Sequence, residues 1–355
     1  MKLSINKGIL ESAIALCNAY ADKKDNSAIT SHLLFEANDD KLVIKASDYE
    51  FGLSYKIKKI KIDSNGFATV QAKSIVDMIK NLANEDIVLE TVENSLFIRQ
   101  KSTKYKLAMF NYEDFPSFPN TDDKDKFDLD SSDLSRSLKK ILPAVDINNP
   151  KMSLNGALID IKSDKINFVS TDTKRLAIYT LKKANDKEFS LSIPKKAIME
   201  MQKLFYEKIE LFYGDNILIA KNEKFEFFTK LINDKFPDYE KVVPKEIKQK
   251  LSFKTEEFLD SLKKISVVAE KMKLHFNKNK LIFEGISLDN MEAKTELDIE
   301  LNIEESFSLN IKIKYLMDFL NSIESEDFEF EINEPNLAFI VRSGELETII
   351  MPVIL

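Results

Sequence analysis

The sequence predicts an α+β protein of three repeated domains, each with two helices packed on antiparallel sheet. A short motif that begins with lysine and alternates polar and apolar residues opens three stretches of the chain, 124 residues apart: Lys2–Ile5, Lys126–Leu129 and Lys250–Phe253. Within each stretch the hydrophobic period switches between two residues and helical spacing, which indicates strands and helices in turn. Each copy is the size of an ordinary domain and exceeds the roughly 20 to 50 residues of a solenoid repeat.

Each copy begins with a strand that is followed by a helix. Apolar residues recur three and four positions apart after the opening motif, and such positions share one face of a helix. We therefore expect one helix with a buried face near the start of each copy. The rows of apolar residues are Leu10, Ile14 and Cys17; Leu134, Leu138 and Ile141; and Phe258, Leu262 and Ile265.

A hairpin and a second helix follow in each copy. Polar turns between alternating segments predict hairpins over residues 35–44, 159–168 and 275–283. Strands such as Phe51–Ile57 and Phe328–Ile332 alternate cleanly, which is typical of a sheet with one solvated face. The predicted order in each copy is β-α-β-β-β-β-α-β-β-β. The second helices are expected over residues 74–82, 196–204 and 315–323.

Polar, proline-containing segments separate the copies. They run from Pro116 to Lys124 and from Pro237 to Pro244. We therefore place the three domains at residues 1–120, 126–244 and 245–355.

Composition narrows the class of protein. The chain has 355 residues, of which 44% are hydrophobic, and no apolar run approaches the roughly 20 residues that span a bilayer. The first strand begins at Lys2, with no hydrophobic signal region before it, and the single cysteine, Cys17, excludes an internal disulfide. The sequence has only seven glycines and contains no glycine-rich motif of the kind that binds nucleotide phosphates. We expect a soluble cytoplasmic protein without a cofactor or metal.

The charges are distributed unevenly. A formal net charge of −7 argues against a protein that simply coats DNA. An ordinary solvated helix face would explain any one run of lysines, but their recurrence in three copies favours a shared basic surface. These lysines are Lys23, Lys24, Lys139, Lys140, Lys195, Lys196, Lys263, Lys264, Lys312 and Lys314, whereas carboxylates gather in strands and turns such as residues 324–331.

The sequence contains no catalytic motif. His32 and His275 are the only histidines, and both are expected to be ordinary strand residues. The acidic pairs at residues 39–40 and 122–123 fall in turns, where aspartate bonds the local backbone. A metal-dependent nuclease would need convergent carboxylates, and no such set stands out. A DNA-processing enzyme and a purely structural scaffold are therefore the alternatives to a non-catalytic binding protein.

Two segments call for more than a structural explanation. One is Leu154–Gly156 with Ser170–Ala177, and the other is the apolar terminus Ile349–Leu355. Proline cannot donate to a sheet ladder, so Pro352 should end the last strand. The residues beyond it would then project from the sheet.

These residues resemble the bacterial beta sliding clamp family, the beta subunit of DNA polymerase III, over the whole chain. The family patterns are T-D-G-H-R-L-A, F-P-D-Y-x-x-V-L-P and a terminal M-P-M-R-L. The matching residues here are Leu154–Gly156, Thr171–Ala177, Phe236–Tyr239 with Val242 and Pro244, and Met351–Leu355.

The resemblance implies a head-to-tail homodimer that closes into a ring around duplex DNA. Two helices from each of six domains would line the hole, and no catalysis is expected. A closed ring needs only weak, sequence-independent contact with phosphates and can therefore slide. The implied partners are duplex DNA, the replicative polymerase catalytic subunit, the clamp loader, repair polymerases, mismatch repair proteins and ligase, with no membrane.

The resemblance also implies a pocket between the second and third domains for partner peptides with leucine or phenylalanine anchors. The chain departs from the family at Thr173–Lys174 (Gly-His), Lys241 (Arg) and Ile354 (Arg), which should change the rim chemistry. The matching positions are Leu154, Thr171, Thr173, Lys174, Arg175, Leu176, Pro237, Lys241, Val242, Ile349, Met351, Pro352, Val353, Ile354 and Leu355.

Ring closure and DNA contact carry over at fewer positions. The dimer interface would join Tyr105 and Leu107, expected to be exposed in a single protomer, to Val267 and Val268 of the partner. For DNA binding the matching residues are Lys24, Lys151 and Met152.

Overall fold

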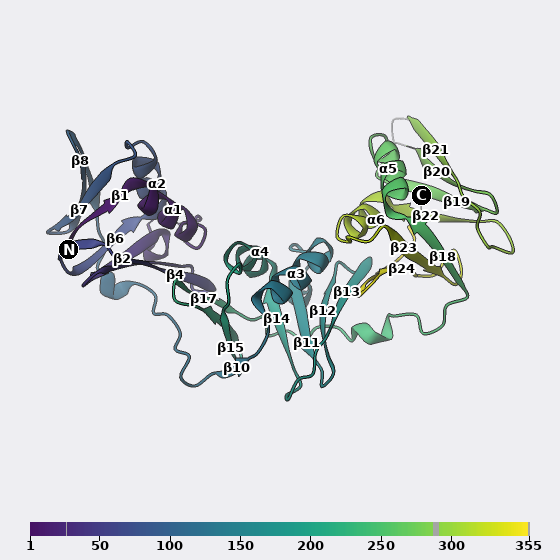
Figure 1. The fold of residues 1–355 in the computed structure, drawn as a ribbon, viewed down its shortest axis with the longest axis horizontal. Helices are drawn as coiled ribbons and strands as arrows, with labels where there is room; N and C mark the ends of the chain where they lie inside the picture. The colour runs from purple at the N-terminus through teal and green to yellow at the C-terminus, as the bar shows by residue number, and fades with distance from the viewer. Residues whose placement is uncertain (26, 287–290, 354–355) are drawn as a thin grey trace. The chain divides into compact units, whose positions relative to one another are not determined.

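The computed structural model describes residues 1–25, 27–286 and 291–353, and its strands and helices recur in three copies (Figure 1). Every residue of the three predicted apolar rows is at most 1% exposed, so the periodicity identified the buried helix faces correctly. Each copy opens with a strand and a helix: β1 (Lys2–Asn6) and α1 (Lys7–Cys17), β10 (Asp125–Phe127) and α3 (Ser131–Ile141), and β18 (Gln249–Lys254) and α5 (Thr255–Ser266).

The predicted strand order is confirmed in the second and third copies. The first copy has one strand more, because the short segment Lys61–Ser64 (β5) pairs with β1. The strands between the helices are β2 (His32–Asn38), β3 (Lys41–Ser47), β4 (Phe51–Lys58), β5 and β6 (Gly66–Gln71); β11 (Gly156–Ile161), β12 (Lys165–Thr171), β13 (Arg175–Lys182) and β14 (Phe189–Pro194); and β19 (Lys271–Asn277), β20 (Lys280–Ile286), β21 (Glu292–Asp298) and β22 (Phe307–Lys312).

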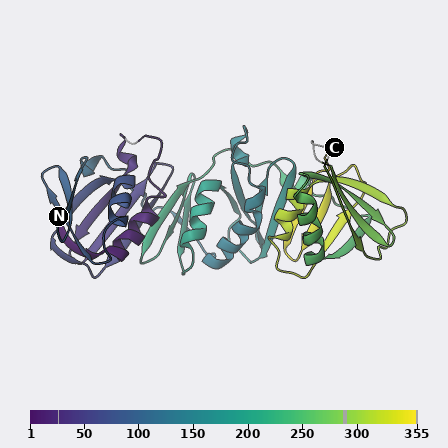
Figure 2. The same ribbon diagram turned by 90° about the horizontal axis from the view of Figure 1, so that it is seen from above.

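The second helix of each copy packs beside the first. Helices α1 and α2 contact each other, as do α5 and α6, and α3 and α4 also lie side by side (Figures 1 and 2). These helices are α2 (Ala72–Lys80), α4 (Lys195–Leu204) and α6 (Ile313–Leu320). The closing strands are β7 (Asp86–Val92), β8 (Ser95–Gln100) and β9 (Thr103–Ala108); β15 (Glu210–Gly214), β16 (Ile217–Lys221) and β17 (Phe225–Lys230); and β23 (Asp327–Ile332), β24 (Phe339–Ser343) and β25 (Leu346–Ile350).

The contacts divide the chain into two compact units. Unit 1 comprises residues 1–131 and 203–231, and unit 2 comprises residues 132–202 and 232–355. Unit 1 holds a five-stranded sheet, β5-β1-β7-β8-β9, and an eight-stranded sheet, β10-β15-β16-β17-β4-β3-β2-β6. Unit 2 holds an eight-stranded sheet, β14-β11-β12-β13-β25-β24-β23-β18, and a four-stranded sheet, β21-β20-β19-β22.

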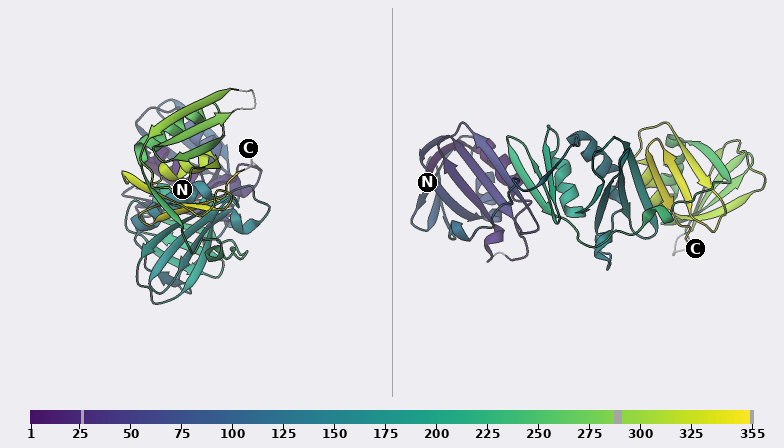
Figure 3. Two further views of the ribbon diagram at one scale, coloured as in Figure 1. Left: turned by 90° about the vertical axis from the view of Figure 1, so that its right-hand side faces the viewer. Right: turned by 90° about the horizontal axis from the view of Figure 1, so that it is seen from below.

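Each eight-stranded sheet is continuous across two copies of the repeat. Strand β4 of the first copy pairs antiparallel with β17, the last strand of the second copy. In the same way β13 of the second copy pairs with β25, the last strand of the third, so the yellow strands follow the teal ones in Figure 3. Within the described residues two comparable strands have no such neighbour: β9 and β21 are edges of their sheets.

Among the described residues no helix is long and apolar enough to cross a membrane. Cys17 is buried on α1, and burial raises the pKa of its thiol.

Candidate functional site

A tight turn joins β12 to β13 in unit 2. The Thr171 hydroxyl donates to the carbonyl oxygen of Arg175 at 2.6 Å, and the N–H of Thr173 donates to the Thr171 hydroxyl at 3.0 Å. One carboxylate oxygen of Asp172 accepts the N–H groups of Lys174 and Arg175 at 3.0 and 2.9 Å. Thr173 has φ of 71°. The turn therefore requires the left-handed conformation that favours glycine, which is the residue the family pattern has here.

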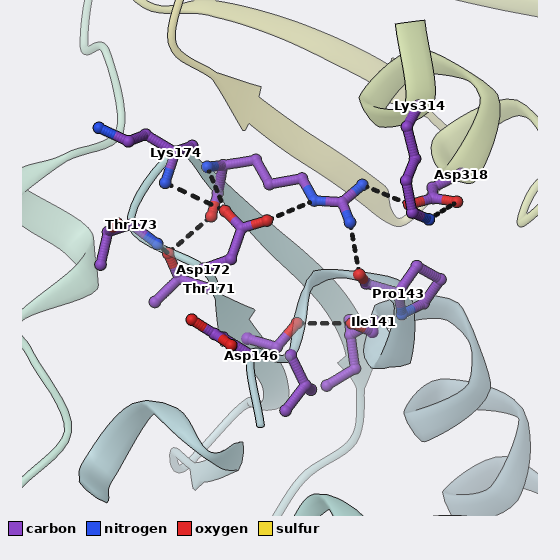
Figure 4. A network of polar contacts seen from close by, with 12 residues as sticks. Ile141, Pro143, Asp146, Thr171, Asp172, Thr173, Lys174, Lys314 and Asp318 are labelled. Carbon is purple, nitrogen blue, oxygen red and sulfur yellow. Dashed lines mark hydrogen bonds and ion pairs between the residues drawn. The ribbon is translucent and has the colours of Figure 1, made fainter. Parts of the chain in front are cut away.

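Arg175 is buried at the end of this turn and is only 5% exposed. Its guanidinium pairs with Asp172 at 3.1 Å and with Asp318 of α6 at 2.8 Å, and it donates to the carbonyl oxygen of Pro143 (Figure 4). It also lies 4.6 Å from the ring centre of Tyr315. Each of the three guanidinium nitrogens of Arg175, a predicted pocket residue, thus has a partner in the protein, and the ion pair with Asp318 fastens the turn to α6.

An apolar floor lies beneath the turn. Leu154, Leu176 and Ile349, three of the predicted pocket residues, belong to one buried cluster. Their side chains meet because β13 and β25 are adjacent, with Leu176 directly opposite Ile349. The other members are Leu158, Val169, Ile178, Phe236, Tyr239 and Ile340, with Val243 and Ala338 packed against them and partly exposed.

The C-terminal segment follows the turn. Strand β25 ends at Ile350, and the N–H of Met351 donates to the carbonyl oxygen of Lys174 at 2.9 Å. Beyond Pro352, the N–H of Val353 donates to the carbonyl oxygen of Asn310 on β22 at 3.0 Å. The segment thus leaves β25 at the proline, as predicted, and Met351 remains 43% exposed. Ile354 and Leu355 lie outside the described residues.

The linker between the second and third repeats completes the site. The Tyr239 hydroxyl donates to Asp160 at 2.7 Å and accepts from Asn167 at 2.9 Å, which anchors the linker to the sheet. Burial, followed by the carboxylate of Asp160, raises the pKa of Tyr239. Next to this anchor, Val242 is 52% exposed. Lys241 pairs with Asp238 at 2.8 Å, and this ion pair raises the pKa of the lysine.

Sequence reasoning missed several residues of this site. Tyr239 stood in the quoted F-P-D-Y motif, so a signal for it existed. Tyr315 and Asp318 gave none, because they belong to an amphipathic helix that is explained by core packing alone. The predicted residues Pro237, Val242, Met351, Pro352 and Val353 are exposed or partly exposed. We call these residues, together with Thr171, Thr173, Lys174 and Lys241, the rim of the site, and the buried cluster its floor.

The predicted DNA-binding residues are accessible. Lys24 in unit 1 and Lys151 and Met152 in unit 2 are all exposed. The shared basic surface is weaker than we expected, because several helix lysines are engaged. Lys140 and Lys195 donate to the carbonyl oxygens of Ser322 and Val145 at 2.9 and 2.7 Å, and Lys263 and Lys314 pair with Asp260 and Asp318 on their own helices.

One expectation for the dimer interface is wrong. Leu107 is only 8% exposed, because on β9 it lies opposite Leu96 and faces the core of its own protomer. Tyr105, on the same face, is partly exposed. At the end of α5, Val267 is 84% exposed and Val268 is partly exposed.

The histidines and acidic pairs occupy the predicted places. His32 begins β2, stacks 4.3 Å from Phe110 and has its pKa lowered by burial. His275 on β19 contacts Glu284 and Ser308 at 2.8 and 2.9 Å. Both acidic pairs lie in turns. Over the described parts of the chain, no group of three or more His, Cys, Asp or Glu residues could hold a metal ion.

Known proteins match this chain over its whole length. The family models for the DNA polymerase III beta subunit match residues 1–119 (N-terminal domain), 128–238 (central domain) and 240–354 (C-terminal domain). The beta sliding clamp of Helicobacter pylori strain J99 is 34% identical, and all of both chains is covered. That of Buchnera aphidicola is 27% identical, with 94% of this chain and 93% of the relative covered.

Solved structures agree with these matches. The crystal structure of the Helicobacter pylori beta clamp bound to a DNA ligase peptide has a TM-score of 0.93 and 35% identity, with 100% of each chain covered. The DNA polymerase III subunit beta of Pseudomonas aeruginosa, at 22% identity, has the same fold with a TM-score of 0.93. This chain belongs to the DNA polymerase III beta subunit family, the bacterial beta sliding clamps.

Proposed function

We propose that this chain is a DNA sliding clamp, a head-to-tail homodimeric ring that encircles duplex DNA and tethers the replicative polymerase for processive synthesis. It is a non-catalytic processivity factor. One observation carries the proposal: family models of the DNA polymerase III beta subunit match all three parts of the chain. The apolar cluster of unit 2, to which β13, the linker and β25 all contribute, supports it. We propose a cytoplasmic location, because a clamp must reach the DNA on which it slides. We assign its three domains to residues 1–120, 126–244 and 245–355.

The site in unit 2 suits a short peptide with apolar anchors. Exposed Val242 and Met351 stand on its rim, and an apolar side chain laid between them would remove their surface from water. The related Helicobacter pylori clamp was solved with a DNA ligase peptide. We assign the same site here to peptides of the polymerase catalytic subunit, the clamp loader, repair polymerases, mismatch repair proteins and ligase, which would compete for it.

Lys24, Lys151 and Met152 are our proposed DNA contacts. Phosphate contacts of exposed lysines are sequence-independent and weaken with salt. They suit a ring that must move along the duplex, because retention then depends on closure and not on affinity.

The repeat suggests how the ring closes. Strand β9 is the counterpart of β17 and β25, and β21 is the counterpart of β4 and β13. In two of the three repeats these counterparts find partners within the chain, as β4 pairs with β17 and β13 pairs with β25. Among the described strands, β9 and β21 are left as edges. Pairing β21 of one protomer with β9 of its partner would repeat the same junction between copies. Such a head-to-tail contact closes when the rotation per subunit allows it.

The internal junctions also supply a register. Tyr55 lies opposite Phe225, and Tyr179 lies opposite Leu346. The two tyrosines stand three residues before the ends of β4 and β13, and their partners begin β17 and β25. The same positions in β21 and β9 are Thr295 and Thr103. Tyr105 would then lie opposite Ala293 of the partner. This position agrees with the interface role that was predicted for Tyr105 together with Leu107, Val267 and Val268.

A disulfide tests this register. In both internal junctions the hydrogen bond falls on the next residue pair, Lys56 with Lys224 at 2.7 Å and Thr180 with Glu345 at 3.0 Å. Thr103 and Thr295 would thus be a non-hydrogen-bonded pair with Cα atoms about 4.5 Å apart, within disulfide range.

We expect the double variant Thr103→Cys with Thr295→Cys to form a covalent dimer on oxidation, which non-reducing electrophoresis detects. Cys17 is buried and gives little background. The control, Thr103→Cys with Ala293→Cys, is out of register at about 7–8 Å and should not cross-link. A monomeric mass in solution would refute the ring, whereas a dimer that cross-links only in the control would refute the register alone.

A further inference from the structure

The turn of the peptide site has a structural copy in unit 1, between β3 and β4. The Ser47 hydroxyl donates to the carbonyl oxygen of Phe51 at 3.2 Å, and the N–H of Tyr49 donates to the Ser47 hydroxyl at 3.1 Å. One oxygen of Asp48 accepts the N–H groups of Glu50 and Phe51, both at 3.1 Å. Tyr49 has φ of 69°, which matches the 71° of Thr173. Residues 47–51 therefore reproduce the four hydrogen bonds through which the side chains of Thr171 and Asp172 hold the other turn.

The surroundings of the two turns also correspond. The N–H of Lys230, just after the last residue of β17 that pairs with β4, donates to the carbonyl oxygen of Glu50 at 2.7 Å, as Met351 does to Lys174. The linker sequence Phe115-Pro116-Ser117-Phe118 parallels Phe236-Pro237-Asp238-Tyr239. The first junction thus has the backbone of a peptide site.

The floors of the two junctions differ. Leu176 lies opposite Ile349 in the second junction, and the corresponding pair in the first junction is Gly52 opposite Phe228. A Cβ atom on Gly52 would lie 2.5 Å from the Phe228 ring, so the ring occupies the space directly over the glycine. The same ring packs edge-on against Phe118, with 5.1 Å between centres. In this junction the floor is filled by an aromatic side chain of the protein itself.

The rims differ as well. The position of exposed Met351 is taken by Lys230, whose ammonium pairs with Glu50 at 3.0 Å. A charged pair offers no apolar surface to a leucine or phenylalanine anchor. Of two homologous junctions, one presents an apolar floor and rim, and the other presents a filled floor and a charged rim.

We propose that Phe228, seated over Gly52, limits each protomer to one partner peptide by occupying the place that an anchor side chain would take at the first junction. This inference rests on the proposed peptide-binding function of unit 2. Its consequence is that partners must compete for one site on each protomer.

The first test transfers the filled floor to the peptide site. The double variant Leu176→Gly with Ile349→Phe roughly conserves volume, so the fold should tolerate it. Calorimetric titration with a peptide that contains adjacent Leu and Phe should show at least a thirtyfold loss of affinity, with the dimer mass unchanged. The matched single variant Leu176→Ala, which adds no ring, should lose less. Affinity equal to that of the unmodified protein would overturn the inference.

The second test opens the first junction. Gly52→Leu with Phe228→Ile again conserves volume, and Lys230→Met supplies the apolar rim. The same titration should rise from one to two peptides per protomer, and adding Leu176→Gly with Ile349→Phe should return it to one. A stoichiometry that stays at one in the dimeric triple variant would overturn the inference. Absence of binding to the unmodified protein would instead refute the proposed function.

Discussion

Tyr49 and Thr173 are two of the described non-glycine residues with positive φ, a backbone conformation that their side chains disfavour, and they stand in homologous turns. A β-branched threonine in the left-handed region is a genuine outlier, and such strain costs of order 1–3 kcal/mol. At Thr173 the strain is retained because Asp172 and Thr171 hold the turn with four hydrogen bonds. The polar side chains of Thr171 and Asp172 therefore fix the conformation of the turn. A residue other than glycine can occupy its central position, but the strain lowers stability.

Replacing Thr173 by glycine should stabilise the protein by about 1 kcal/mol, because the relief of strain exceeds the roughly 0.5–1 kcal/mol entropic cost of glycine. Urea unfolding monitored by circular dichroism measures the change. The matched control is Lys174→Gly, where φ is not positive and where glycine should destabilise. Destabilisation by Thr173→Gly would show that the threonine side chain makes a compensating contact.

Residue-level prediction succeeded where burial follows a period within one element. The apolar rows of α1, α3 and α5 are of this kind, because helical spacing alone determines which face is buried. It failed where the environment comes from another part of the chain. Leu107 was expected to be exposed, because its own strand does not specify the neighbour, Leu96 on β8, opposite which it is buried. The ion pair of Arg175 with Asp318 could not be foreseen, because Asp318 lies in another repeat.

Elements of different repeats are joined by a small number of polar contacts as well as by strand pairing. In unit 2 the Arg175–Asp318 pair connects the β12–β13 turn to α6, and Tyr315 covers the guanidinium. An arginine buried this deeply needs its carboxylate partners, because an uncompensated buried charge is costly.

Asp318→Asn should destabilise unit 2 by about 3 kcal/mol, since breaking a buried pair leaves the arginine short of a partner. The change appears as a lower midpoint of urea unfolding. Lys314→Gln is the control, because it removes only the exposed partner of the same carboxylate and should cost at most about 1 kcal/mol. Equal effects of the two variants would mean that Arg175 finds another acceptor.

The C-terminal segment is the element whose removal should separate binding from folding. Deleting Met351–Leu355 takes away one apolar side of the rim, and losing a buried anchor contact costs about 2 kcal/mol, roughly a thirtyfold loss of peptide affinity. Titration with the Leu-Phe peptide measures this loss, and light scattering should still show a dimer. A monomeric product would show that the segment is needed for the fold.

Met351→Ala serves as the milder companion of this deletion. It keeps the N–H that bonds to the carbonyl oxygen of Lys174 and removes only the exposed apolar side chain. Its affinity should fall between those of the intact and truncated proteins. Binding by the truncated dimer at full strength would move the partner site elsewhere.

The existence and order of elements were predictable because the repeat supplied three readings of each pattern. Strand β5 was missed, since its four residues, Lys61–Ser64, include two charges and form no apolar row. The pairing of β4 with β17 and of β13 with β25 also could not be predicted, because nothing in a strand's own alternation specifies its neighbour. Of the site, the motifs indicated the turn and the tail, but not the residues that hold them.

At the scale of the whole molecule, closure around DNA predicts a behaviour that binding at a local surface site would not produce. Once loaded, the protein should remain on closed circular duplex at moderate salt and should leave when the circle is cut, because phosphate contacts alone weaken steeply with ionic strength. Gel filtration of the loaded circle, before and after a single restriction cut, measures retention. Equal retention on cut and intact circles would indicate ordinary surface binding.

The edge strands β9 and β21 also make the lone protomer prone to aggregation. Each presents a row of free backbone donors and acceptors that could template unwanted association into open chains or amyloid-like sheets. The charges along both strands, such as exposed Lys104 and Lys106 on β9 and exposed Glu292 on β21, oppose the dry stacking that such aggregates need. Ring closure removes both edges at once. Dilution, or any mutation that weakens closure, should therefore reduce solubility as well as processivity, and cells carrying such a clamp would lose protein to aggregation before they lose its fold.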